Sequence, residues 1–67
     1  MSKIVKVIEV LAQSTKSWED ATNTAIKEAS KSIKDIKSIN IVNTSAKVEN
    51  NKIVKYRITA QISFVVN

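Results

Sequence analysis

Arg57 and Gln61 are the two side chains whose chemistry and spacing best suit the binding of a small ligand. They lie four residues apart in a segment that alternates apolar and polar residues, so both project from the same face of a strand. A guanidinium can stack on a planar ring or clamp a phosphate or carboxylate, and an amide both donates and accepts hydrogen bonds. Each has a structural alternative: an ion pair between subunits for Arg57, and a solvated or interface amide for Gln61.

Glu19 and Asp20 are adjacent carboxylates and are therefore candidate ligands for calcium, which takes carboxylate and carbonyl oxygens. The sequence contains no glycine, so it holds no EF-hand loop. The two acids also follow Ser17 in the pattern of a capping box, in which Asp20 reaches back to the start of a helix. Capping and a favourable interaction with the helix dipole are the structural alternative for both carboxylates.

The composition excludes several kinds of chemistry. The sequence has neither cysteine nor histidine, so it offers no zinc site of the common kind and no thiol or imidazole catalyst. It also lacks a nucleophile–base pair and a glycine-rich loop, so we do not expect an enzyme. Without disulfides, a core built from 67 residues needs another source of stability, and oligomerisation is the one we expect.

The charge pattern argues against nucleic acid and membrane partners. The formal net charge is +5, but the 11 basic residues are spread along the whole chain, as is typical of a solvated surface. The aromatic strand motifs of RNA-binding modules are absent. No segment approaches the roughly 18 apolar residues of a membrane span, and residues 1–4 open directly into a strand pattern rather than a signal peptide. We therefore expect a cytoplasmic protein.

The hydrophobic pattern predicts four elements that position these residues. Residues 3–12 and 38–49 are expected to be strands, and residues 53–66 alternate most clearly, with Arg57 and Gln61 on the polar face. Residues 13–16 form a polar connection, and Asn50 and Asn51 form a hairpin turn because asparagine tolerates positive φ. A helix begins after Ser17, with an apolar stripe made of Trp18, Ala21, Ala25, Ala29, Ile33 and Ile36. We interpret Trp18 as a packing or subunit-contact residue, and Tyr56 and Phe64 as core residues.

The order of these elements predicts an α+β fold of the β-α-β-β type. The hairpin makes the last two strands antiparallel, and the long alternation of residues 53–66 suits the central place in the sheet. The expected sheet is fully antiparallel, with its strands in the spatial order 2-3-1 and one face packed on the helix. The other face, which carries Arg57, Thr59 and Gln61, is left for a partner subunit, solvent or a ligand.

The chain resembles the dodecin family over its whole length, so we expect one dodecin-like domain over residues 1–67. The resemblance rests on the opening KIVKVIEVLAQSTKSWEDA, the helix segment NTAIKEASKSI and the closing YRITAQISFVV, in this order and spacing. It is nearest to the branch of the family with SWE at the helix start and YRI in the third strand. The resemblance implies a hollow homododecameric shell, with strands inside and helices outside, that binds or stores a small molecule.

Dodecins that bind flavin carry a tryptophan near the start of the second strand, which stacks on the flavin ring, and a glutamine after the aromatic residue of the third strand. The resemblance places Ser38 and Arg57 at these two positions. A serine cannot stack, so we expect the affinity for flavin mononucleotide or riboflavin to be weak or absent. The leading hypothesis is a small-ligand binding and storage shell with Ser38, Arg57 and Gln61 as candidate ligand-binding residues. The alternative is a structural or calcium-binding assembly that does not use flavin.

Overall fold

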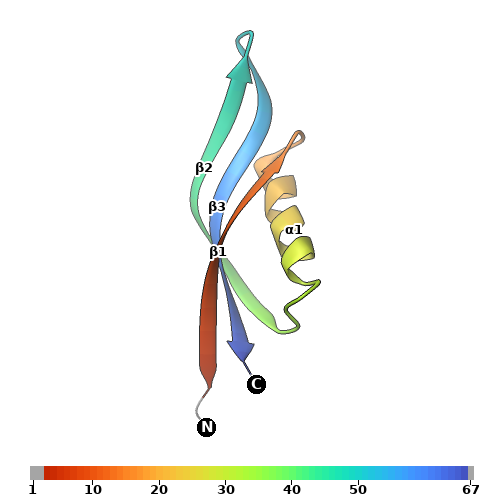
Figure 1. Cartoon of the computed structure of the whole chain (residues 1–67). Helices are drawn as coiled ribbons and strands as arrows, with labels where there is room; N and C mark the ends of the chain where they lie inside the picture. The colour runs from red at the N-terminus through yellow and green to blue at the C-terminus, as the bar shows by residue number, and fades with distance from the viewer. Residues whose placement is uncertain (1–2, 67) are drawn as a thin grey trace.

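The computed structural model describes residues 3–66 and contains one helix and three strands. In chain order these are β1 (Ile4–Ser14), α1 (Trp18–Ala29), β2 (Ile36–Glu49) and β3 (Lys52–Val66). Figure 1 shows the helix lying along one side of the sheet. The predicted β-α-β-β order is confirmed. The part of our opening-strand prediction that concerns Met1 and Ser2 lies outside the described residues.

The sheet is antiparallel and has the order β1-β3-β2, which confirms the predicted central place of β3. On one side Gln13 of β1 lies opposite Arg57, and on the other side Ser45 of β2 lies opposite the same residue. The turn at Asn50 and Asn51 is also as predicted, with φ angles of 52° and 63°. Asparagine is one of the few residues that adopt this left-handed region at low cost, so it can replace glycine here.

The helix starts as the capping pattern indicates. Ser17 is extended, and its hydroxyl accepts a hydrogen bond from the backbone N–H of Asp20 at 2.9 Å. The carboxylate of Asp20, which we expected to reach back to the helix start, accepts a hydrogen bond from the hydroxyl of Ser14 at 2.6 Å. The predicted connection over residues 13–16 was too long, because Gln13 and Ser14 continue β1 and bring the Ser14 hydroxyl to the helix.

The helix ends earlier than its apolar stripe predicts. It stops at Ala29, and Ile33 lies in the following turn region while Ile36 is the first residue of β2. The backbone N–H of Ile33 still donates a hydrogen bond to the Ala29 carbonyl at 3.0 Å. This helix-like spacing keeps Ile33 in line with the apolar stripe although α1 has ended. Ile36 then pairs with Phe64 in the sheet, so its place in the stripe reflects burial by β3 rather than a further helical turn.

The core lies between α1 and the alternate residues of β3 that face it. Its fully or nearly fully buried members are Ala21, Ala25, Ile58, Ala60 and Ile62. Small alanines on the helix let it approach the sheet closely, and the isoleucines of β3 supply most of the buried volume. This confirms that the face of β3 opposite Arg57, Thr59 and Gln61 packs on the helix.

The molecule is elongated for its size. Its radius of gyration is 13.9 Å, whereas a compact domain of this length has about 11 Å. Figure 1 shows the cause, because the β2–β3 hairpin runs well past β1 and α1, while the start of β1 and the end of β3 lie toward the other end. β1 ends its pairing where Ser14 meets Tyr56. Beyond that point the hairpin is a two-stranded ribbon, which is only marginally stable by itself in water.

Candidate ligand site on the open face of the sheet

The face of the sheet opposite the helix carries the predicted ligand residues. Arg57 and Gln61 are exposed, and they alternate along β3 with Ile58, Ala60 and Ile62, which are buried under the helix. The same open face continues onto β1, where Leu11 lies opposite Thr59 and is 81% exposed. The face therefore combines polar groups with an uncovered apolar surface, as a small-ligand site requires.

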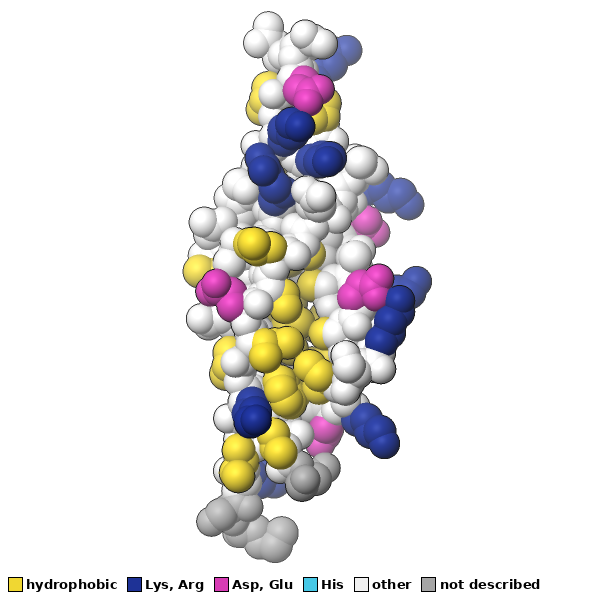
Figure 2. Space-filling model, viewed as in Figure 1, with side chains coloured by type: hydrophobic (Ala, Val, Ile, Leu, Met, Phe, Trp, Pro, Cys, Tyr) yellow, Lys and Arg dark blue, Asp and Glu magenta, His cyan; other side chains and the backbone are white. Residues whose placement is uncertain are grey.

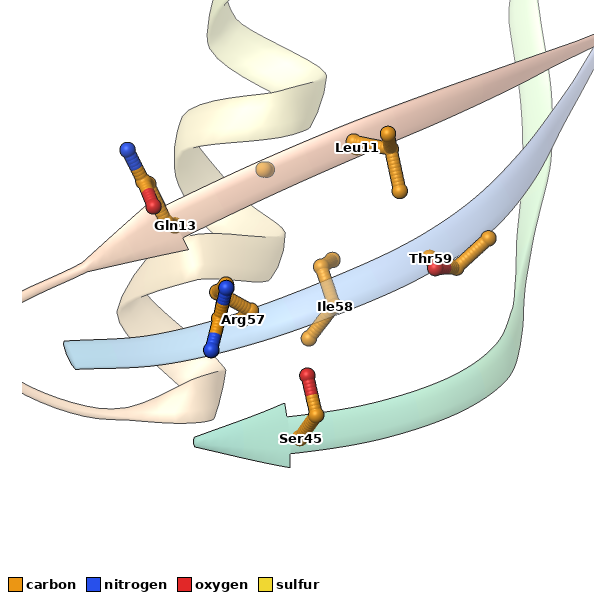
Figure 3. Close-up of a pocket in the computed structure, with 7 residues that line it drawn as sticks. Leu11, Gln13, Ser45, Arg57, Ile58 and Thr59 are labelled. Atoms are coloured by element: carbon orange, nitrogen blue, oxygen red, sulfur yellow. The ribbon is translucent and has the colours of Figure 1, made fainter. Parts of the chain in front are cut away.

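A pocket of about 430 Å³ opens on this face around Arg57. Figure 3 shows that Gln13, Arg57 and Ser45 come from three neighbouring strands, with the helix behind the sheet. Leu11 and Thr59 add an aliphatic side chain and a hydroxyl, and Ala12 and Ile58 also line the pocket. The pocket thus offers a guanidinium, an amide, two hydroxyls and an aliphatic side chain, which suits a ligand with an anionic or polar end and an apolar body.

Gln13, Ser45 and Leu11 are site residues that the sequence pattern did not indicate. Each of them reaches the pocket only because the strand register places Gln13 and Ser45 opposite Arg57, and Leu11 opposite Thr59. The alternation along β3 shows which face Arg57 occupies, but it carries no information about which residues of β1 and β2 lie beside it. Only the strand pairing places them beside Arg57 and Thr59.

The structure does not bring all three predicted ligand residues together within one chain. Gln61 lies opposite Glu9 and Asn40, two register steps beyond Thr59, and does not line the Arg57 pocket. Ser38 lies opposite Ser63 near the other end of the sheet, and their hydroxyls are hydrogen-bonded. Ser63 lies six positions after Arg57 on β3, which is roughly 20 Å along a strand. Ser38 and Arg57 therefore belong to separate parts of the open face.

Trp18 lies on the helix-covered side of the sheet. Its indole N–H donates a hydrogen bond to the carbonyl of Ser45 at 2.9 Å, and its ring meets Tyr56 edge-on with centroids 4.8 Å apart. The side chain remains 39% exposed. Within one chain, Trp18 thus ties the first turn of α1 to β2 and β3, while part of its ring is left for solvent or another subunit.

The acidic residues do not form a recognisable metal centre in this chain. Glu19 is exposed, and the carboxylate of Asp20 is held by the Ser14 hydroxyl. Across residues 3–66 no group of three or more acidic side chains gathers closely enough to hold a metal ion. The two carboxylates lie at the positive end of the helix dipole, where they stabilise the helix.

A large apolar surface remains uncovered in the single chain. Exposed apolar side chains occur on β1, on β2 and at the hairpin, among them Ile4, Val5, Val7, Val48 and Ile53. A second pocket, of about 460 Å³, lies between β1 and α1 and is lined largely by apolar residues such as Val10, Ala25 and Ile33. Over residues 3–66 the structure offers no helix that is long and apolar enough to cross a membrane.

The fold defines a class of small β-α-β-β proteins with one helix on a three-stranded antiparallel sheet. Dodecin from Streptomyces davaonensis superposes with a TM-score of 0.94 at 15% identity, covering 100% of this chain and 98% of that one. The crystal structure of calcium dodecin from Mycobacterium tuberculosis superposes with a TM-score of 0.84 at 30% identity, covering 96% and 91% of the two chains.

The sequence comparisons agree with the structural ones. The sequence profile described as Dodecin matches residues 4–67. Calcium dodecin from Mycobacterium tuberculosis is 31% identical over 61 residues, which are 91% of this chain and 86% of that protein. The chain therefore belongs to the dodecin family, as its sequence indicated.

Proposed function

We propose that this protein is a non-catalytic binding and storage protein that holds a small molecule on the open face of its sheet. The observation that carries the proposal is the pocket around Arg57, where polar groups from three strands meet the exposed side chain of Leu11. Equilibrium dialysis of the purified protein against a panel of small anions and planar cofactors tests it. Saturable binding that is lost in Arg57→Ala is expected, and no binding of any compound would contradict the proposal.

We also propose that the working form is a closed homo-oligomer of the dodecin type. The small core, the unsupported hairpin and the exposed apolar side chains of β1 all favour burial against further copies of the chain. A dodecamer has a mass of about 89 kDa, twelve times the 7.4 kDa of one chain. Light scattering on the purified protein measures this directly, and a well-folded monomer would refute the assembly.

Flavin is not the ligand we favour, because a serine at position 38 supplies no aromatic face for stacking. Quenching of flavin fluorescence by the unaltered protein should be weak. The double variant Ser38→Trp with Arg57→Gln should strengthen it markedly, because one change adds the stacking ring and the other replaces a fixed charge with a neutral hydrogen-bonding group. Tight binding of riboflavin by the unaltered protein would contradict this expectation.

Calcium binding is a second candidate, favoured by the 31% identity to a relative named calcium dodecin. Glu19 and Asp20 supply oxygens of the kind calcium prefers, and a closed assembly would bring carboxylates from several chains together. Calorimetric titration with calcium should show binding that falls in Asp20→Asn and Glu19→Gln. Glu28→Gln removes a carboxylate from the last turns of the same helix and is the matched control. Equal losses in all three variants would point to a general charge effect rather than a site.

A further inference from the structure

Positive charge is concentrated where the hairpin leaves the rest of the sheet. Lys47 of β2 lies directly opposite Lys55 of β3, and Arg57 follows two residues later on the same open face. In the view of Figure 2, several Lys and Arg side chains lie close together over the hairpin half of the molecule, whereas those on the other half are spread around its edges and most of the apolar side chains gather between them. We call Lys47, Lys55 and Arg57 the basic cluster.

The basic cluster is not neutralised within the chain. Like charges directly opposite one another in an antiparallel sheet are destabilising. Lys47 is paired with Glu49 at 3.2 Å, but over residues 3–66 no carboxylate lies within ion-pair distance of Lys55 or Arg57. The cluster therefore carries an excess of positive charge, and binding an anion there would relieve the repulsion.

The geometry suits a compact anion with several oxygens. Opposite residues of the two strands have Cβ atoms about 5 Å apart, and residues two apart on one strand are separated by roughly 7 Å. Flexible lysines and a planar guanidinium at these spacings can surround a single phosphoryl group, with Arg57 able to donate two parallel hydrogen bonds. Ser45, which lies opposite Arg57, adds a hydroxyl donor beside it.

Arg57 is the member of the basic cluster that lines the pocket, and the pocket reaches from it onto Gln13 and Leu11 of β1. Its far side is formed by Leu11 and Thr59, and Leu11 is 81% exposed. An anion held by the basic cluster would thus have an uncovered apolar surface next to it, within a pocket of about 430 Å³, a volume in the range of small-molecule sites. Phosphate alone would leave this surface unused.

We propose that the ligand of the open face is a phosphate monoester, with its phosphoryl group on the basic cluster and its apolar body over Leu11 and Thr59. This deepens the proposed binding function and rests on it. The competing occupant of the cluster is a set of acidic side chains from a second copy of the chain. That occupant would make Lys55 and Arg57 assembly residues instead of ligand residues.

The test is calorimetric titration of the intact assembly at low ionic strength with phenyl phosphate, inorganic phosphate and phenol. Phenyl phosphate should bind more tightly than inorganic phosphate, phenol should not bind measurably, and the affinity for phenyl phosphate should fall as salt is raised. Arg57→Gln and Lys55→Gln should each weaken phenyl phosphate at least about tenfold. Lys34→Gln removes the same charge before β2, away from the hairpin, and should change the affinity by less than about twofold.

Several outcomes would overturn the proposal. Phenyl phosphate that fails to bind the folded assembly, or that binds Arg57→Gln and Lys55→Gln as tightly as the unaltered protein, excludes the site. Equal affinities for inorganic phosphate and phenyl phosphate exclude the apolar part of the assignment. Dissociation of both variants in light scattering, with no phosphate binding by the unaltered protein, assigns the cluster to a second copy. A monomeric unaltered protein would instead refute the proposed assembly, so the two failures are distinguishable.

Discussion

The two faces of the sheet have opposite environments although their residues alternate along the same strand. On the helix-covered face Ile58 is only 2% exposed and Ile62 is fully buried, whereas on the open face Leu11 is 81% exposed. Arg57 and Gln61 are immediate neighbours of these buried isoleucines in the sequence. The covered face holds the chain together, and the open face is the one on which we propose that ligands and other chains bind. One strand can serve both purposes because its side-chain period is two.

Removing a side chain from the covered face should have the largest effect on stability. Ile62→Ala should lower the free energy of unfolding by about 2–5 kcal/mol, because the fully buried side chain leaves a cavity under the helix. Urea unfolding at a fixed protein concentration measures the loss, since the proposed assembly would make stability depend on concentration.

The matched control for Ile62 is its neighbour on the other face. Gln61→Ala should change the free energy of unfolding by less than about 0.5 kcal/mol, because Gln61 is exposed. A loss in Gln61→Ala as large as that in Ile62→Ala would contradict the comparison, because it would mean that the open face is packed as tightly as the core.

Trp18 tests how firmly the helix is fastened over the hairpin end of the covered face. Trp18→Ala removes the hydrogen bond to the Ser45 carbonyl and the edge-on contact with Tyr56. We expect a loss of about 2 kcal/mol, the sum of one hydrogen bond and one aromatic pair, since the ring is only partly buried.

Trp18→Phe separates the two contributions, because it keeps a ring beside Tyr56 and loses the indole N–H. It should recover roughly half of the stability lost in Trp18→Ala. If Trp18→Ala instead leaves unfolding unchanged and abolishes binding of phenyl phosphate, Trp18 belongs to the ligand site and not to the packing of the covered face.

Loss of the helix cap at Ser17 should lower stability less than loss of the Trp18 side chain. Ser17→Ala removes the hydroxyl that accepts from the backbone N–H of Asp20, and it should cost about 1 kcal/mol of stability. Ser17→Asp retains an acceptor and should lose much less. Thermal unfolding followed by circular dichroism compares the two variants, and equal losses would show that the hydroxyl does not cap α1.

Much of the covered face could be predicted from the sequence because its determinants are local. The alternation around Ile58 and Ile62, the cap at Ser17 and the asparagine turn are each fixed by residues a few positions apart. The end of the helix could not be placed in the same way. Ile33 and Ile36 keep the helical spacing, but a turn and then pairing with β3 bury this part of the chain instead.

The open face was harder to predict because it depends on strand register. Arg57 and Gln61 could be assigned to one face, but the sequence does not determine that Gln13 and Ser45 flank Arg57. The opposition of Lys47 and Lys55 is equally a product of register, and the bulge between Lys47 and Val48 shifts the pairing of the hairpin beyond it. Sequence patterns within one strand contain none of this information.

A substitution on the solvent side of α1 should have the smallest effect on the stability of the fold. Glu28 there forms an ion pair with Lys31 at 2.7 Å between two well-exposed side chains. The hydrogen bond from Lys31, with its positive charge, lowers the pKa of Glu28 below the ordinary value of 4.5. The folded state thus releases this proton more readily than the unfolded state, so the pair stabilises the fold above pH 4.5 and the contribution is lost as the pH falls through the lowered pKa.

Glu28→Gln should therefore lower stability slightly at pH 7 and not at all in strong acid. Exposure of both partners keeps the difference small, and added salt should shrink it further. Thermal unfolding of the variant and the unaltered protein, followed from neutral pH into strong acid, measures the difference in stability directly. Lys31→Gln removes the other partner and should give the same pH dependence. A difference that persists unchanged in acid would mean that Glu28 contributes through packing against the β1–α1 pocket that it lines, rather than through its charge.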